Sequence, residues 1–218
     1  MVPAGFYAVG VPARPATTAD LDAVVDVVAL AFHGDPVWGP ALRKPDGSVD
    51  HLSGFWRFFV DAAVQRGSLF VWDRAAAVAV WVPAGEPELT DVQQRELEMF
   101  IDREFPKERA AALAALFDRF DAAHPHAEPH ATLSLLATHP RHRGRGVGQQ
   151  LLAANLAELD ARGVPSYLES TNPGNDHRYE RAGFRRVGCF ESLDGAPITT
   201  MWRPVAATGT PGARGDEH

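Results

Sequence analysis

The order of apolar and polar residues divides this chain into alternating helices and strands. Apolar residues recur at helical intervals of three and four over residues 17–34, 51–66, 90–104, 107–123, 147–162 and 175–182. Short apolar runs predict a short first strand that ends with residues 14–16. They predict further strands at 69–72, 76–82, 132–138, 167–171, 184–192 and 198–203. The proline- and glycine-containing segment 37–50 is predicted to be a loop. This order predicts an α/β fold, in which a mixed sheet carries helices on both faces.

The predicted elements fit one domain with short ends. We assign residues 1–13 to an N-terminal extension, 14–204 to the domain, and 205–218, which are rich in Gly, Thr and Pro, to a disordered tail. Met1–Phe6 lacks a basic region followed by an apolar run, so no signal peptide is expected. No apolar run is long enough to cross a membrane.

Composition narrows the class of partner. The net charge of −7 argues against nucleic-acid binding, which normally needs a basic face. Against this acidic background, Arg141, Arg143 and Arg145 form a basic cluster suited to a polyanion. The single cysteine, Cys189, allows no intrachain disulfide, which fits a cytoplasmic protein. Cys189 lies in a strand-like run, where we expect it to pack as a small apolar residue.

The basic cluster belongs to a glycine-rich loop, residues 139–152, between a predicted strand and a predicted helix. Strand, glycine loop and helix together bind phosphate, because free backbone N–H groups and the helix dipole point at the anion. The loop lacks the Gly-x-Gly-x-x-Gly of dinucleotide-binding folds and the Gly-Lys-Ser/Thr of Walker loops. The fine pattern of the loop therefore points elsewhere.

The pattern Arg143-x-x-Gly146-x-Gly148, followed by a Leu-Leu pair, resembles the acyl-CoA loop of the GNAT superfamily of N-acetyltransferases. A second frame, from Arg141, also fits the spacing. The resemblance continues at Tyr179-Glu180-x-x-Gly183-Phe184 and covers roughly residues 14–204. Within the superfamily, the chain looks most like the actinobacterial branch related to puromycin N-acetyltransferase. The resemblance implies a GNAT fold: a twisted, mostly antiparallel mixed sheet with a two-helix insertion before the fourth strand.

The resemblance also implies a site for acetyl-CoA as co-substrate. The pantetheine arm would lie beside the fourth strand, and the pyrophosphate would lie over backbone N–H groups of the loop. Tyr179 matches the family's general acid, and Asn175 matches a CoA-contacting asparagine that equally suits a helix N-cap. The residues so assigned to the cofactor are Leu136, Ala137, Thr138, Arg143, Gly144, Arg145, Gly146, Val147, Gly148, Gln149, Asn175 and Tyr179.

The general base is not apparent in the sequence. Many GNAT enzymes carry a glutamate on the fourth strand, and the matching position here is Thr132. Glu169 and His130 are the candidates, because a carboxylate acting through water and an imidazole can both move protons near neutral pH. The alternatives are a strand-end carboxylate in a hydrogen-bond network for Glu169 and a solvated loop residue for His130.

The acceptor site is the least defined part of the sequence. Trp38 in the 37–50 segment is expected to line a ligand site, since loop aromatics often do, and Asp35 is a candidate for attracting a cationic amine. A solvated loop carboxylate is the alternative for Asp35. His124, His126 and His130 lack a matching ligand pair, so no metal is expected.

These observations predict a cytoplasmic enzyme that acetylates a primary amine of a small molecule, such as an aminonucleoside or another amine antibiotic. We expect a monomer or homodimer, with no nucleic-acid or membrane partner. Two alternatives stay open: a non-catalytic acyl-CoA-binding domain, and an acetyltransferase of protein N-termini or lysines.

Overall fold

The computed structural model describes residues 13–206 of the 218-residue chain. Within them, seven strands form one sheet in the order β1-β2-β3-β4-β5-β7-β6. The strands are β1 (Ala13–Pro15), β2 (Leu69–Trp72), β3 (Ala77–Val82), β4 (Ala131–Thr138), β5 (Ser166–Ser170), β6 (Arg185–Glu191) and β7 (Pro197–Arg203). The β4–β5 pair is parallel, and the other described pairs are antiparallel. The predicted α/β fold with a mixed, mostly antiparallel sheet is confirmed.

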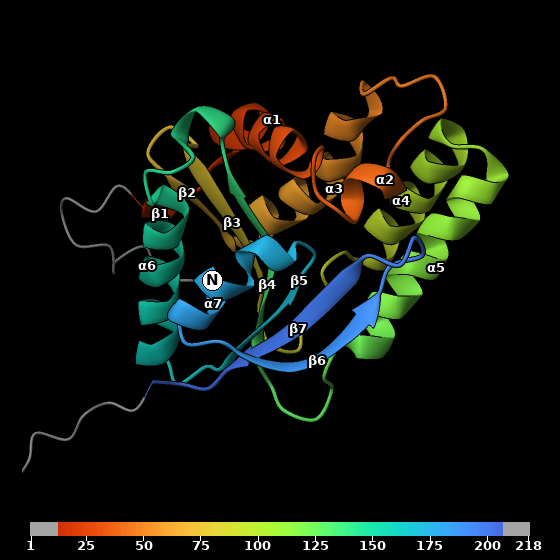
Figure 1. Ribbon diagram of the computed structural model, residues 1–218. Helices are drawn as coiled ribbons and strands as arrows, with labels where there is room; N and C mark the ends of the chain where they lie inside the picture. Colours follow the sequence, from red (N-terminus) through yellow and green to blue (C-terminus); the bar gives the residue numbers. More distant parts are fainter. Residues whose placement is uncertain (1–12, 207–218) are drawn as a thin grey trace, which may run out of the picture.

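Helices cover both faces of this sheet (Figure 1). They are α1 (Leu21–Phe32), α2 (Trp38–Ala41), α3 (His51–Arg66), α4 (Asp91–Glu104), α5 (Lys107–Ala123), α6 (Val147–Ala161) and α7 (Asp176–Arg181). Helices α1 to α5 pack on one face through Val28, Trp56 and Leu113, among others. Helix α6 packs on the other face through Leu151, Leu152 and Leu156. The predicted insertion of two helices before the fourth strand is α4 and α5.

Two local predictions were wrong. The 37–50 segment is not entirely loop, because Trp38–Ala41 forms the short helix α2. The first helix is preceded by a separate 3-10 turn over Thr18–Asp20. In both places the tertiary packing of nearby aromatic or charged side chains determines a conformation that apolar periodicity does not show. The remaining helices and strands begin and end within one residue of their predicted bounds.

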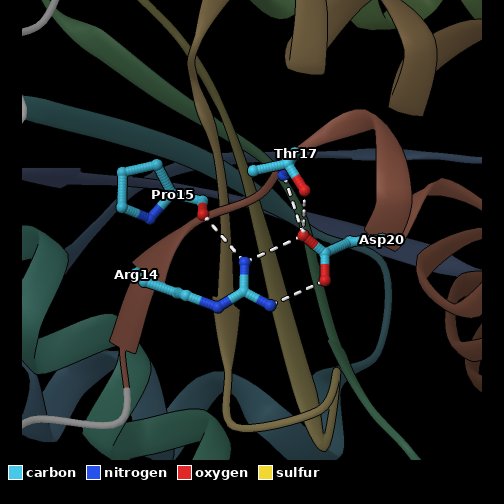
Figure 2. A network of polar contacts seen from close by, with 4 residues as sticks. All are labelled: Arg14, Pro15, Thr17 and Asp20. Carbon is cyan, nitrogen blue, oxygen red and sulfur yellow. Dashed lines mark hydrogen bonds and ion pairs between the residues drawn. The ribbon is translucent and has the colours of Figure 1, made fainter.

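The chain is anchored at its first strand by a polar network around Asp20 (Figure 2). The Asp20 carboxylate accepts hydrogen bonds from the Arg14 guanidinium at 2.6 and 2.8 Å and from the Thr17 backbone N–H at 2.8 Å. Arg14 also donates to the Pro15 carbonyl. The network therefore joins β1 to the turn that starts α1, where Thr17 and Asp20 form a capping box.

Strands β4 and β5 separate soon after they meet. Their ladder consists of Ala131 opposite Ser166 and Thr132 opposite Tyr167, and β4 then continues along β3 alone. The register of β3 against β4 also shifts: Val80 faces Leu135 and Trp81 faces Leu133. Ser134 is therefore an extra residue, a β-bulge, at the point where the two strands diverge. The separation from β5 leaves the rest of β4 with one edge open towards a cleft.

Some predictions concern the ends and the last strands. The predicted extension (1–13) and tail (205–218) lie almost wholly outside the described residues. The hairpin around Asp194-Gly195 joins β6 to β7, and Gly195 has a positive φ of 77°.

Cys189 is exposed on β6, so the prediction that it packs as a buried apolar residue was wrong. Strand β6 lies at the edge of the sheet and most of its residues are exposed, which strand periodicity cannot reveal.

Candidate active site

A cleft of about 1450 Å³ follows β4 from end to end. At the carboxyl end of β4 the cleft is bordered by the glycine-rich loop and the start of α6, and at the amino end by the segment that follows α5. The eight residues of β4 extend about 23 Å at roughly 3.3 Å per residue. The cleft is therefore long enough to hold an extended cofactor arm and an acceptor end to end.

The glycine-rich loop has the backbone that a phosphate site needs. Gly144 and Gly146 have φ values of 77° and 74°, which side chains rarely adopt, and Gly146 occupies the N-cap of α6. Gly148 is required by packing, because a Cβ there would lie 2.5 Å from the Thr138 hydroxyl oxygen. The glycines thus bring the first turn of α6 directly against the end of β4.

The predicted cofactor residues fall into two groups. Leu136, Thr138, Arg143, Gly144, Gly146, Val147, Gly148, Gln149, Asn175 and Tyr179 all border the cleft. Ala137 points into the apolar core on the α1 side of the sheet, and the exposed Arg145 does not border the cleft. Only the backbone of Ala137 is therefore placed to contact a cofactor in the cleft. Arg178 and Arg181, which the sequence analysis did not select, border the cleft at the same end as the glycine-rich loop.

Tyr179 projects from α7 into the cleft and packs edge-on against Phe184. Burial, reinforced by the negative charges of Asp35 and Asp176, raises the pKa of Tyr179 to about 12. The phenol therefore keeps its proton at any physiological pH, as a proton donor must. Asn175 lies at the N-cap of α7, but its side chain makes no capping hydrogen bond.

Asp35 and Trp38 are more constrained than the sequence implies. Asp35 is buried, and its carboxylate accepts from the backbone N–H groups of Val37 and Trp38 and from the Thr171 hydroxyl at 2.8 Å. It is thus no solvated loop carboxylate. Trp38 is buried on α2 and stacks on Phe120 at 5.7 Å between ring centroids. Both residues still border the cleft, as part of its wall.

Glu169 and His130 meet through a third residue. The Glu169 carboxylate lies 3.6 Å from Nδ1 of His124, and Nε2 of His124 lies 3.2 Å from Nε2 of His130. Nδ1 of His130 donates to the Glu128 carbonyl at 2.7 Å, so its Nε2 is free to accept from His124. His130 is buried against Tyr167 and Trp202, so it is no solvated loop residue.

Sequence reasoning missed Glu88, in the loop between β3 and α4. Its carboxylate accepts a hydrogen bond from the hydroxyl of Ser134, the β4 bulge residue. Burial raises the pKa of the Glu88 carboxyl. Glu88 lies 46 residues from Ser134 in the chain, so no local motif could have paired the two.

Comparison with known proteins now identifies the fold. Residues 56–184 match the model of the acetyltransferase (GNAT) family. The chain belongs to this family. The match includes β4, the glycine-rich loop, α6 and Tyr179, so it spans the end of the cleft that the loop borders. GNAT enzymes use acetyl-CoA, and the chain is accordingly an acetyltransferase.

Solved GNAT structures share the whole architecture. A Corynebacterium glutamicum protein described as "histone acetyltransferase HPA2 and related acetyltransferase" is 26% identical, with a TM-score of 0.64 over 92% of this chain and 99% of its own. Arylalkylamine N-acetyltransferase 2 of Aedes aegypti is 15% identical, with a TM-score of 0.60 over 90% and 99%. A Drosophila melanogaster polyamine N-acetyltransferase is 14% identical, with a TM-score of 0.61 over 88% and 98%. At 15% and 14% identity, the two insect enzymes show a likeness of fold alone.

Two further findings describe this GNAT domain. Among residues 13–206, no group of three or more His, Cys, Asp or Glu side chains could hold a metal ion. No helix in the same range is long and apolar enough to cross a membrane. The absence of a metal and the cytoplasmic location stay predictions.

Proposed function

We propose that this GNAT enzyme transfers the acetyl group of acetyl-CoA to the primary amine of a small cationic molecule in the cytoplasm. The observation that carries the proposal is the charge of the cleft. Arg143, Arg178 and Arg181 border its cofactor end, whereas Glu88, Asp121 and Glu169 border the other end. A polyanionic donor and a cationic acceptor would thus meet near the middle of β4.

Acetyl-CoA would be held chiefly by backbone. The pyrophosphate would lie over the N–H groups of residues 143–149, at the positive end of α6, with Arg143 adding a charge-assisted bond. The pantetheine amides would pair with the open edge of β4 at residues 136–138. A backbone N–H of the same edge would stabilise the oxyanion of the tetrahedral intermediate.

The reaction requires two protons to leave the acceptor nitrogen. The ammonium first loses one proton to a base, and the neutral amine then attacks the thioester carbonyl, forming the C–N bond. The intermediate collapses as the C–S bond breaks, and Tyr179 protonates the departing thiolate. The second nitrogen proton restores the phenol. The products are the acetamide, free CoA thiol and one proton released to water.

The acceptor wall favours a small amine with an apolar body. Trp38, Phe117 and Phe120 form an aromatic surface beside the carboxylates, and such walls bind the apolar part of a ligand while charged groups orient it. The substrates for which the two insect neighbours are named, arylalkylamines and polyamines, have this character. An aminonucleoside, as the puromycin N-acetyltransferase-like branch would imply, also fits this description.

The proposal is tested by release of CoA thiol from acetyl-CoA across a panel of acceptors. The panel holds agmatine, spermidine, a phenylethylamine, puromycin and a lysine-containing peptide with a free N-terminus, with mass spectrometry of each product. We expect turnover with at least one small amine and little with the peptide. Turnover with the peptide alone would show a protein acetyltransferase, the kind of enzyme for which the C. glutamicum neighbour is named. Binding of CoA without turnover on any acceptor would show a non-catalytic domain.

A further inference from the structure

Granted the proposed acetyl transfer, we infer that Glu88 is the catalytic base that takes the first proton from the acceptor ammonium, with Ser134 and Arg66 as its positioning residues. The base would then come from the β3–α4 loop, although the sequence resemblance pointed to the fourth strand. Thr132, at the resembling position, has no group that can accept a proton from an ammonium.

The Glu88 carboxylate lies beside the bulge of β4. It accepts from the hydroxyl of Ser134, which is the bulge residue of β4. Ser134 follows Thr132, the last β4 residue paired with β5, by two positions. The carboxylate therefore lies where the strands begin to separate. In the proposed reaction, the acceptor nitrogen reaches the thioester at this opening.

The backbone of Glu88 is held in place by Arg66. Arg66, near the C-terminus of α3, donates to the carbonyl oxygens of Pro87 at 3.0 Å and Glu88 at 2.6 Å. Its side chain is 14% exposed, and its Nε pairs with Glu86 at 3.2 Å. A loop carboxylate with its own backbone fixed at two carbonyls is preorganised, which a base needs to meet a substrate proton at hydrogen-bond distance.

The electrostatic surroundings of Glu88 also suit a general base. Charged or titratable groups on three elements besides its own loop face Glu88: Arg66 on α3, His124 beyond α5 and Glu169 on β5. Burial is the largest cause that raises the pKa of Glu88, Glu169 raises it further, and the Ser134 hydrogen bond opposes both. A carboxyl shifted upwards takes a proton at a pH closer to neutral, which suits a general base better than an ordinary carboxylate.

Glu169 is the competing base, and its contacts give it a different place. Its carboxylate faces His124, which in turn contacts His130. In this position Glu169 is suited to accept a proton from Glu88 or to pass that proton on towards solvent. Removal of Glu169 would then lower the rate less than removal of Glu88.

The test compares Glu88→Gln with Glu169→Gln and with Glu86→Gln as matched control. Glu86 lies in the same loop and is half exposed, and its loss leaves the two backbone contacts of Arg66 intact. For each folded variant, kcat and kcat/KM would be measured from pH 6 to 10 with the best small amine, and acetyl-CoA affinity by calorimetry. Glu88→Asp keeps a carboxylate and serves as second variant if Glu88→Gln does not fold.

We expect kcat/KM of Glu88→Gln to fall about a hundredfold at pH 7 with acetyl-CoA affinity unchanged. The deficit should shrink as the pH approaches the range where the free amine itself is deprotonated, since no base is then needed. Glu88→Asp should recover part of the rate, and Glu86→Gln should stay within about twofold of the parent. Arg66→Met and Ser134→Ala should lower kcat about tenfold and shift the acidic limb of the pH profile.

Three results would overturn the inference: a Glu88→Gln deficit that is constant across pH, a parent-like rate, or a larger deficit in Glu169→Gln. Each leaves acetyl transfer by the parent enzyme in place. Failure of the parent to acetylate any amine is a separate outcome, which overturns the proposed function itself.

Discussion

Single side chains carry the proton chemistry, and Tyr179 is the most direct to test. Tyr179→Phe deletes only the hydroxyl, so packing against Phe184 should persist and the melting temperature should change little. We expect kcat to fall by about a hundredfold or more with acetyl-CoA affinity retained. Because the pKa of Tyr179 is raised to about 12, the parent should show no loss of rate from phenol ionisation below pH 10. A near-normal kcat under chemistry-limited conditions would exclude this hydroxyl as the acid.

Gly148 tests packing at the same scale. Gly148→Ala places a Cβ 2.5 Å from the Thr138 hydroxyl, so the Thr138 side chain, α6 or β4 must shift. We expect a loss of about 1–3 kcal/mol in the free energy of unfolding, measured by urea denaturation, together with weaker acetyl-CoA binding. Thr138→Ala removes the clashing oxygen, so the double variant should recover most of the stability. Additive losses in the double variant would contradict this account.

Among the elements, β1 and the start of α1 depend on the Asp20 network. The Arg14 guanidinium holds the pKa of Asp20 well below its ordinary range. A lowered pKa means that this stabilisation is complete above about pH 4, the unfolded-state value, and is lost as the pH falls further. Because Arg14 is partly exposed, Asp20→Asn should lower the free energy of unfolding by only about 1 kcal/mol at pH 7. The difference from the parent should become progressively smaller at acidic pH, where Asp20 itself is protonated.

The control for Asp20 is Asp22→Asn, two residues further along the chain. Asp22 pairs with Arg57, but its side chain is 89% exposed. Exposed pairs of this kind contribute little, so urea denaturation should show almost no change. Equal losses in the two variants would mean that general charge removal, rather than the network, explains the effect.

For the molecule as a whole, cofactor binding should couple to stability. A ligand at about a hundred times its Kd stabilises the folded state by about 2.7 kcal/mol, which for a chain of this size raises the melting temperature by roughly 5–10 °C. We expect CoA to produce this shift, and adenosine, which lacks the pyrophosphate, to produce almost none. Arg143→Glu should abolish the shift, because it places a negative charge at the pyrophosphate site.

Arg145→Glu makes the same charge change two residues away, on a side chain that does not border the cleft. Its CoA shift should be reduced much less than that of Arg143→Glu. The two results together separate a specific phosphate contact from a general electrostatic effect on an acidic protein. A CoA shift in Arg143→Glu equal to the parent's would contradict the assignment of the loop.

Short-range patterns determined most of the architecture. Apolar spacing within each helix and strand depends on neighbours three or four residues away, or two, so the element bounds could be predicted. The loop from Arg143 to Gly148 could likewise be recognised because its glycines serve a local backbone need. Tyr179 and Asn175 followed from a motif of the same short range, and both border the cleft.

Only the tertiary structure determined the contacts between distant parts of the chain. Thr171 meets Asp35 across 136 residues and turns a supposed solvated carboxylate into a structural one. Helix α2 exists where Trp38 stacks on Phe120 of α5. Glu88 reaches β4 only because Arg66 holds its loop and a bulge presents Ser134. Such contacts leave no local periodicity, since they depend on how whole elements pack, and the candidate base was therefore invisible in the sequence alone.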